Sequence, residues 1–296
     1  MSRRRSAFGQ ALGFVPSALA LAIVRSLPYG ARVAFGGWLG RRLVRGLPRF
    51  RDRVEANLAH VWPDLGPAER ARIAGQVGDT FGRTFVEIFS MAQFQRRRLW
   101  AGPEGPGVAA LEAAAREGRG AVIVTGHFGQ WEAGRAWLKS IGAECAAVYR
   151  PLNNRHLDAI YVRQLEIGGR PMFEKGGRGL RALVGHLRKG GLVAILTDQY
   201  DRRAAPFDFL GRPAPTVTIA ADLALRAGVP LVPGYGLREA DGLRVRVVVE
   251  APVPHTTAAE MTQAVNDSLA ARVRAAPGQY LWLHRRWRKD LPVPPR

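Results

Sequence analysis

Short apolar runs alternate with longer amphipathic segments between residues 108 and 274. The runs are rich in β-branched residues and too short for helices, so each predicts a buried strand. They occupy residues 121–125, 146–149, 192–196 and 230–235. Helical spacing of apolar positions predicts helices over residues 108–117, 130–141, 157–167, 180–187, 217–226 and 261–274. This alternation predicts an α/β fold with a mostly parallel sheet flanked by helices.

Two further segments border this pattern. Residues 243–250 alternate apolar and polar side chains, which predicts an edge strand with one solvated face. Residues 101–107 are rich in glycine and proline, which predicts a loop or a boundary before the α/β region. Residues 57–89 precede this loop and predict helices, with phenylalanines at helical spacing that are typical of a core.

The N-terminal segment has a different character. Residues 6–24 carry no charge and follow the arginines at positions 3–5. They predict an uncleaved membrane anchor or a re-entrant helix, although Pro16 interrupts the run and a confident span needs roughly 20 apolar residues. A buried amphipathic helix of a soluble domain is the alternative.

Six arginines follow between Arg41 and Arg53, interleaved with leucine, valine and phenylalanine. Such a segment suits a surface facing anionic lipid, and it equally suits a solvated helix face. We therefore divide the chain into an N-terminal membrane anchor with a basic juxtamembrane segment, residues 1–50, and a main domain, residues 51–296. The expected architecture is thus an α/β domain with an N-terminal membrane-associated helix.

The charge of the chain points to an anionic partner. The 296 residues carry a formal net charge of +20, and only four of the 44 basic residues are lysines. An arginine-rich composition accounts for part of this charge, and the rest attracts lipid head groups, an acidic protein or nucleic acid. The single cysteine, Cys145, excludes an internal disulfide and a cysteine zinc cluster.

Candidate chemistry begins where the first predicted strand ends. The sequence Gly-His-Phe-Gly-Gln-Trp-Glu over residues 126–132 predicts a sharp turn into a helix. In such a turn His127 and Glu132 can converge, with the imidazole as a base and the carboxylate fixing its tautomer. The alternative is structural: His127 caps the loop, and Glu132 is favoured by the helix N-terminus.

Two more predicted strands end in polar residues. Arg150 follows the second strand, and Asp198 and Gln199 follow the third. Because the carboxyl ends of parallel strands meet at one edge of a sheet, we expect these groups to lie near His127 and Glu132. Taken singly, a loop arginine and a turn-forming aspartate need no function. Their joint placement favours a site.

Other chemistries lack their motifs. The sequence contains no His-Glu-x-x-His, Cys-x-x-Cys, P-loop or Gly-x-Ser-x-Gly pattern. We therefore expect neither a metal site nor a serine nucleophile. The basic segment Leu283-His284-Arg285-Arg286-Trp287-Arg288 suits a head-group or carrier contact, or simply a helix end, and His284 is not counted as catalytic.

Several segments together resemble the bacterial lipid A biosynthesis acyltransferases of the lauroyl/myristoyl type, within the lysophospholipid acyltransferase superfamily. The resemblance runs from Arg51 to Arg288, with one departure: Gln130 stands where the family usually has Asn. The segments that carry it are residues 127–132, 148–154, 198–199, 208–214, 224–226, 229–233 and 280–287.

The resemblance implies a glycerolipid-acyltransferase-like fold for residues 51–296 and an activity. The family transfers a fatty acyl chain from acyl carrier protein, or in relatives acyl-CoA, to a lipid hydroxyl. By resemblance His127 deprotonates the hydroxyl and Glu132 completes the dyad, while Arg150, Asp198 and Gln199 contact substrate. No metal or redox cofactor is needed, since the thioester supplies the driving force. The expected partners are a membrane lipid acceptor, the acyl donor and an anionic surface, at the cytoplasmic face of the bacterial inner membrane.

Competing functions remain open at this point. The acceptor is a lipid A precursor, or else a lysophospholipid or another glycolipid, although glycerophosphate acyltransferases usually show Asn-His-x4-Asp, unlike this chain. A non-catalytic lipid-binding protein of the same fold would not need the His127 and Glu132 pair. Nucleic acid is not expected as a partner, because no recognisable binding module accompanies the charge. Acyl-chain length and oligomeric state stay undetermined.

Overall fold

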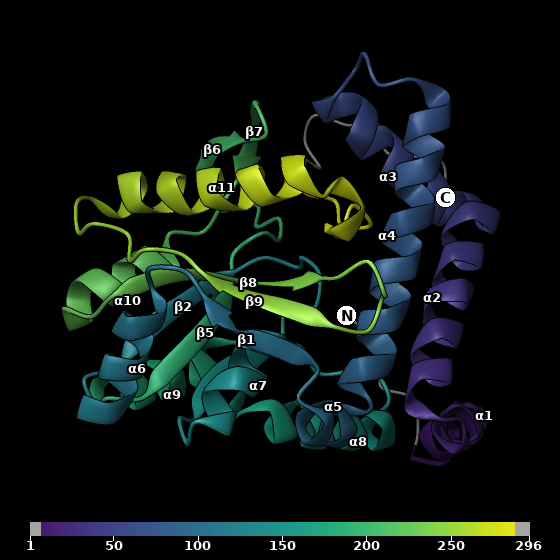
Figure 1. Ribbon diagram of the computed structural model, residues 1–296, viewed down its shortest axis with the longest axis horizontal. Helices are drawn as coiled ribbons and strands as arrows, with labels where there is room; N and C mark the ends of the chain where they lie inside the picture. The colour runs from purple at the N-terminus through teal and green to yellow at the C-terminus, as the bar shows by residue number, and fades with distance from the viewer. Residues whose placement is uncertain (1–6, 288–296) are drawn as a thin grey trace.

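The computed structural model describes residues 7–287, with side chains from residue 14 onward. The arginines at positions 3–5 and Arg288, singled out above, lie outside these residues. Five helices open the described chain, and an α/β region follows them (Figure 1). The five are α1 (Ala7–Ser26), α2 (Tyr29–Gly46), α3 (Pro48–Val61), α4 (Pro67–Ile88) and α5 (Met91–Arg97).

A seven-stranded sheet forms the centre of the α/β region. Its strands are β1 (Trp100–Glu104), β2 (Ala121–Thr125), β3 (Cys145–Tyr149), β4 (Met172–Glu174), β5 (Leu192–Leu196), β8 (Leu231–Arg238) and β9 (Val245–Val249), in the order β1-β9-β8-β2-β5-β3-β4. Neighbours from β8 to β4 pair in parallel, as do β1 and β9, whereas β8 and β9 pair antiparallel. The predicted mostly parallel α/β sheet is therefore confirmed.

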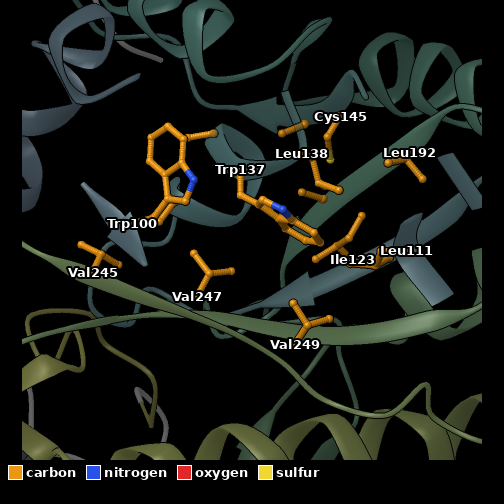
Figure 2. Packing of buried hydrophobic residues seen from close by; sticks show 14 of the residues in the cluster. Trp100, Leu111, Ile123, Trp137, Leu138, Cys145, Leu192, Val245, Val247 and Val249 are labelled. Atoms are coloured by element: carbon orange, nitrogen blue, oxygen red, sulfur yellow. The ribbon is translucent and has the colours of Figure 1, made fainter. Parts of the chain in front are cut away.

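Helices cover both faces of this sheet. They are α6 (Val108–Glu117), α7 (Ala133–Ser140), α8 (Arg155–Gly168), α9 (Gly177–Arg188), α10 (Ile219–Ala227) and α11 (Ala258–Ala275). Alternate residues of β2 divide between two cores: Ile123 packs with α6 and α7, and Val122 and Val124 pack with α9, α10 and α11. Figure 2 shows the first core, where Trp137 and Leu138 of α7 lie over Ile123 and Val249.

A third core joins the N-terminal helices to the other end of the chain. Residues of α3 and α4 pack there with Phe209 and with Trp282 and Trp287 near the C-terminus. Phe209 lies in a small hairpin of β6 (Pro206–Phe209) and β7 (Arg212–Pro215). A short 3-10 helix, η1 (Pro277–Gln279), leads from α11 into the C-terminal segment. The C-terminal part of the described chain thus packs against the helices near its start.

Helix α2 crosses α4 at very short range. A Cβ on Gly82 would come within 2.0 Å of the Gly36 carbonyl oxygen, and one on Gly40 within 2.1 Å of the Gly78 carbonyl oxygen. Only glycine permits this approach of two backbones. The expected anchor segment forms α1, and no helix within residues 7–287 combines the length and hydropathy needed to cross a membrane. The anchor in its spanning form therefore has no support.

Two predictions about strands were wrong. Residues 101–107, expected as a loop, begin inside β1, which pairs with β9 far along the chain. The strand predicted over residues 243–250 does not lie at an edge, because β1 covers its outer side. Arg246 is exposed between the buried Val245 and Val247, and this alternation carries no information about the neighbouring strand.

Candidate active site

The turn between β2 and α7, residues 126–132, lies at the carboxyl edge of the sheet. Strand β2 lies beside β5, and β5 lies beside β3, all three in parallel. Their ends bring His127, Arg150 and Asp198 with Gln199 to one edge, as the sequence predicted. This is where open parallel sheets place their ligand crevices.

Asp198 is the carboxylate that contacts the His127 imidazole. Its Oδ1 lies 2.8 Å from Nδ1 of the ring, and its Oδ2 accepts the backbone N–H of His127 at 2.8 Å. An ionised carboxylate only accepts hydrogen bonds, so it selects the tautomer with hydrogen on Nδ1. The Nε2 atom then carries a free lone pair.

The Asp198 side chain is 4% exposed, so its negative charge must be stabilised by protein groups in place of water. Burial by itself raises the pKa of this carboxyl group. The positive charge of His127 and two hydrogen bonds from the same residue outweigh burial and hold the pKa below its usual value. Asp198 is therefore a carboxylate at neutral pH, and an imidazolium formed on His127 is stabilised beside it.

Glu132 points into the core instead of toward His127. Its Oε2 pairs with Nη1 of Arg135 at 2.5 Å, and both side chains are almost fully buried. Arg135 also donates to the backbone carbonyls of Cys145 and Gly169, which fixes the guanidinium behind α7. The structure thus combines His127 with Asp198 and Glu132 with Arg135, and the predicted dyad role of Glu132 stays a prediction.

Gln199 lies beside the imidazole, whereas Arg150 lies two strands away along the same edge. The Gln199 amide nitrogen lies 3.4 Å from Nε2 of His127, and the Gln199 side chain is exposed. Arg150 is exposed at the end of β3, one strand beyond Asp198. The Trp131 ring stands edge-on to the imidazole, with 5.1 Å between ring centroids. The His127 side chain is 17% exposed, and its Nε2 has the Gln199 amide beside it.

The turn itself is held from three sides. Residue Gly129, with φ at +55°, donates its N–H to the Gln279 carbonyl and accepts from the Thr84 hydroxyl at 2.9 Å. The His127 carbonyl accepts the N–H of Leu281 at 3.0 Å. Gln130 donates its N–H to the Gly236 carbonyl at 2.8 Å. Helix α4, strand β8 and the C-terminal segment thus fix the backbone that carries His127.

A buried polar network supports the turn from α4. The Gln130 side chain is fully buried, donates to Glu87 Oε2 at 2.7 Å and accepts the N–H of Glu132. Glu87 in turn pairs with Arg238 of β8 at 2.5 Å. Glu87 and Arg238 were missed in the sequence. The available signal was a carboxylate in the middle of an apolar helical stretch, which is rarely buried unless paired.

His284, set aside in the sequence, also lies at this edge. Its Nε2 accepts the backbone N–H of Tyr200 at 3.1 Å, next to Gln199. Behind the turn, an apolar cavity of about 30 Å³ lies between α7 and the sheet, lined in part by Thr125 and Trp131. A single water needs about 10–15 Å³ on this measure, so the cavity does not hold a fatty acyl chain in this conformation. Within residues 7–287, no group of three or more His, Cys, Asp or Glu side chains is arranged to hold a metal ion.

Comparison with known proteins agrees with this geometry. The sequence profile of the family described as bacterial lipid A biosynthesis acyltransferase matches residues 8–289. The chain is 29% identical over 276 residues to the lipid A biosynthesis palmitoleoyltransferase of Escherichia coli, covering 90% of this chain and 88% of that protein. It is 27% identical to the Escherichia coli lipid A biosynthesis lauroyltransferase over 274 residues, with the same coverage. It is also 26% identical over 286 residues to the phosphatidylinositol mannoside acyltransferase of Mycobacterium tuberculosis, covering 86% of this chain and 87% of that protein.

Proposed function

The chain belongs to the bacterial lipid A biosynthesis acyltransferase family and is an acyltransferase, and we propose that it moves a fatty acyl chain from an acyl thioester to a hydroxyl of a lipid A precursor. The observation that carries this proposal is the His127 imidazole at the edge of the sheet. Its Nδ1 is engaged by Asp198, and its Nε2 carries the lone pair that can accept a substrate proton, with the Gln199 amide nitrogen 3.4 Å away. A non-catalytic lipid-binding protein would not need a buried carboxylate that selects this tautomer.

His127 is the general base of the proposed reaction. Its Nε2 takes the proton from the acceptor hydroxyl while the hydroxyl oxygen attacks the thioester carbonyl carbon. The tetrahedral intermediate then collapses: the C–S bond breaks, the ester remains, and the imidazolium returns its proton to the departing thiolate. No acyl-enzyme forms. The thioester supplies the driving force, so the proposed reaction uses no metal or redox cofactor.

The neighbouring groups have separate proposed roles. Both carboxylate oxygens of Asp198 are engaged by His127, which favours holding the imidazole over the expected contact with substrate. Gln199, 3.4 Å from Nε2, is placed to contact the acceptor hydroxyl. Arg150 is suited to a phosphate of the acceptor or to the developing oxyanion through its bidentate fork. Glu132 remains the predicted second member of the dyad.

We further propose that α1 and α2 rest on the membrane surface. Val15, Leu19 and Ile23 follow one face of α1 and are 60%, 60% and 57% exposed, and Trp38 of α2 is 51% exposed. Large apolar side chains at this exposure are typical of a lipid or protein contact. Arg42 lies over the Trp38 ring and supplies positive charge beside it.

The position of α1 relates this apolar face to the site. The Phe14 ring lies 5.3 Å from the ring of His156, in the first turn of α8. Helix α8 follows Arg150 and so begins at the same edge of the sheet as the catalytic turn. A lipid acceptor in the membrane is then close to His127. The donor, an acyl carrier protein or acyl-CoA thioester, would reach this edge from the cytoplasmic face of the bacterial inner membrane.

A second acceptor class has its own support. Phosphatidylinositol mannoside acyltransferases match this chain at 26% identity, close to the 29% of the lipid A enzyme. A lysophospholipid or another glycolipid is therefore the alternative acceptor. The proposed chemistry is the same in each case, because His127 acts on the acceptor hydroxyl and not on the rest of the lipid.

Mass spectrometry of total lipids tests the proposal. In a host strain from which the gene is deleted, we expect lipid A to lack one acyl chain, and we expect wild type but not His127→Ala to restore it. The His127→Ala enzyme should lose at least about a hundredfold in transfer rate. Full transfer by His127→Ala would refute the general base. If lipid A is unchanged and a phospholipid or glycolipid is altered, that lipid is the acceptor in place of the lipid A precursor.

A further inference from the structure

The segment from residue 277 to residue 287, here named the strap, crosses the catalytic edge after α11. It bonds to the catalytic turn twice, through the Leu281 N–H to the His127 carbonyl and through the Gln279 carbonyl to the Gly129 N–H. Its Trp282 and Trp287 are buried in the third core. The strap is therefore fixed at both ends, with His284 between them.

His284 connects the strap to the second loop of the site. Its Nε2 accepts the N–H of Tyr200 at 3.1 Å, and its backbone carbonyl accepts from the Asn57 side chain at 2.9 Å. Tyr200 follows Gln199 and Asp198 directly, the two residues that contact the two nitrogens of the His127 ring. The His284 imidazole thus anchors the loop whose side chains orient the His127 imidazole.

This contact needs a neutral His284. A backbone N–H only donates, so Nε2 must carry a lone pair, which a protonated imidazole lacks. The charged and titratable groups that face His284 are Asp198 and His127 of the site, Arg53 of α3 and Arg286 of the strap. Burial lowers the pKa of His284, and Arg286 and Arg53 add to this effect against the pull of Asp198. The environment therefore favours the state that the contact requires.

We propose that His284 is a positioning residue, which holds the loop of residues 198–200 in place so that Asp198 and Gln199 keep the His127 ring in its reactive orientation. This inference rests on the proposed function of His127 as a base. It also gives a purpose to a motif that the reaction itself does not use. The strap then belongs to the catalytic machinery without touching substrate.

Replacement of His284 by alanine and by glutamine tests the proposal. A glutamine Oε1 lies near the position of the imidazole Nε2 and accepts the same hydrogen bond, without titrating. We expect His284→Ala to lower kcat about tenfold, the scale of one hydrogen bond, with KM within about twofold of wild type. His284→Gln should restore kcat to within about threefold. The assay uses a lauroyl thioester of acyl carrier protein and a lipid A precursor with one free hydroxyl.

The pH profile separates positioning from simple stability. Wild type loses the Tyr200 contact when His284 is protonated, whereas His284→Gln has no such group. As the pH falls through the range in which His284 becomes protonated, the glutamine variant should keep a larger fraction of its neutral-pH kcat than wild type does. Thermal unfolding of each variant shows whether it folds. His255→Gln is a matched control, since His255 bonds to the Val229 carbonyl at 3.0 Å, away from the site.

A second measurement does not depend on turnover. Nitrogen-15 NMR of labelled histidines reports the tautomer of His127 directly. We expect the preference for hydrogen on Nδ1 to weaken in His284→Ala and to be retained in His284→Gln. A wild-type kcat in His284→Ala, or a His284→Gln enzyme that folds but is no better than the alanine variant, would overturn the inference. If wild type transfers no acyl chain to any lipid, the proposed function fails, and the tautomer of His127 in the two variants still decides whether His284 positions the ring.

Discussion

Asp198 accepts two hydrogen bonds from His127, one from the ring and one from the backbone, both at 2.8 Å. In Asp198→Asn, the amide can accept only one of them and turns a donor toward the other. We expect kcat to fall at least about a hundredfold, because the imidazole is no longer held in the reactive tautomer. Acyl-transfer kinetics measure this loss. Asp201→Asn in the same loop is the control and should stay within about twofold of wild type.

Glu132 and Arg135 form a buried pair, so removing one charge leaves the other without compensation. Glu132→Gln should lower the free energy of unfolding by about 3–5 kcal/mol. Replacing both residues, as Glu132→Leu with Arg135→Met, should recover about half of that loss, which denaturant unfolding measures.

The same double variant tests the predicted dyad. If Glu132 acts in the chemistry, the folded double variant remains at least about a hundredfold less active than wild type. A double variant that folds and works within about threefold of wild type would limit Glu132 to supporting the turn.

The exposed apolar side chains of α1 and α2 predict binding to anionic membranes. Leu19→Ser combined with Trp38→Ser should weaken binding to phosphatidylethanolamine–phosphatidylglycerol vesicles about tenfold or more, since about half of each side chain is free to enter lipid. Vesicle sedimentation measures the affinity, and added salt should weaken the binding further. Ile141→Ser is the control, because Ile141 is similarly exposed at the opposite edge of the sheet. Unchanged binding of the double variant would contradict the membrane contact.

The close crossing of α2 and α4 predicts that the free energy of unfolding depends steeply on side-chain size at the glycines of the contact. Gly82→Ala would place a Cβ 2.0 Å from the Gly36 carbonyl oxygen, so the helices must separate. We expect a loss of about 3 kcal/mol in the free energy of unfolding. Gly46→Ala, on the partner helix α2 and with open space around it, should instead gain about 0.5 kcal/mol. Equal effects of the two substitutions would contradict the close crossing.

The centre of the fold could be predicted because its signals are local. Residues 121–125 and 192–196 are continuous apolar runs, and each coincides with a strand that is covered on both faces. Strand β1 has no such signal, since Trp100–Glu104 contains glycine and proline and exists through pairing with β9. The hairpin β6–β7 likewise depends on α11 and the C-terminal aromatic residues that it packs against.

The candidate site, like the fold, could be predicted only in part. Its location followed from three strand ends, which is a property of topology. The carboxylate that contacts His127 could not be predicted in this way, because nearness in sequence favoured Glu132, five residues away, over Asp198 in another loop. The chain turns Glu132 inward at the start of α7, where Arg135 lies one helical turn further on. Sequence spacing alone does not reveal which of two carboxylates faces a ring.

The strap also has a consequence for biosynthesis. The ribosome makes the catalytic turn, residues 126–132, and must add residues 133–276 before it reaches the strap. A nascent chain can therefore pair β2 with β5 and still lack the Leu281 and Gln279 contacts that close the turn. A chain that ends before residue 277 lacks both contacts and also the Trp282 and Trp287 side chains of the third core, so the backbone that carries His127 loses its support from this side.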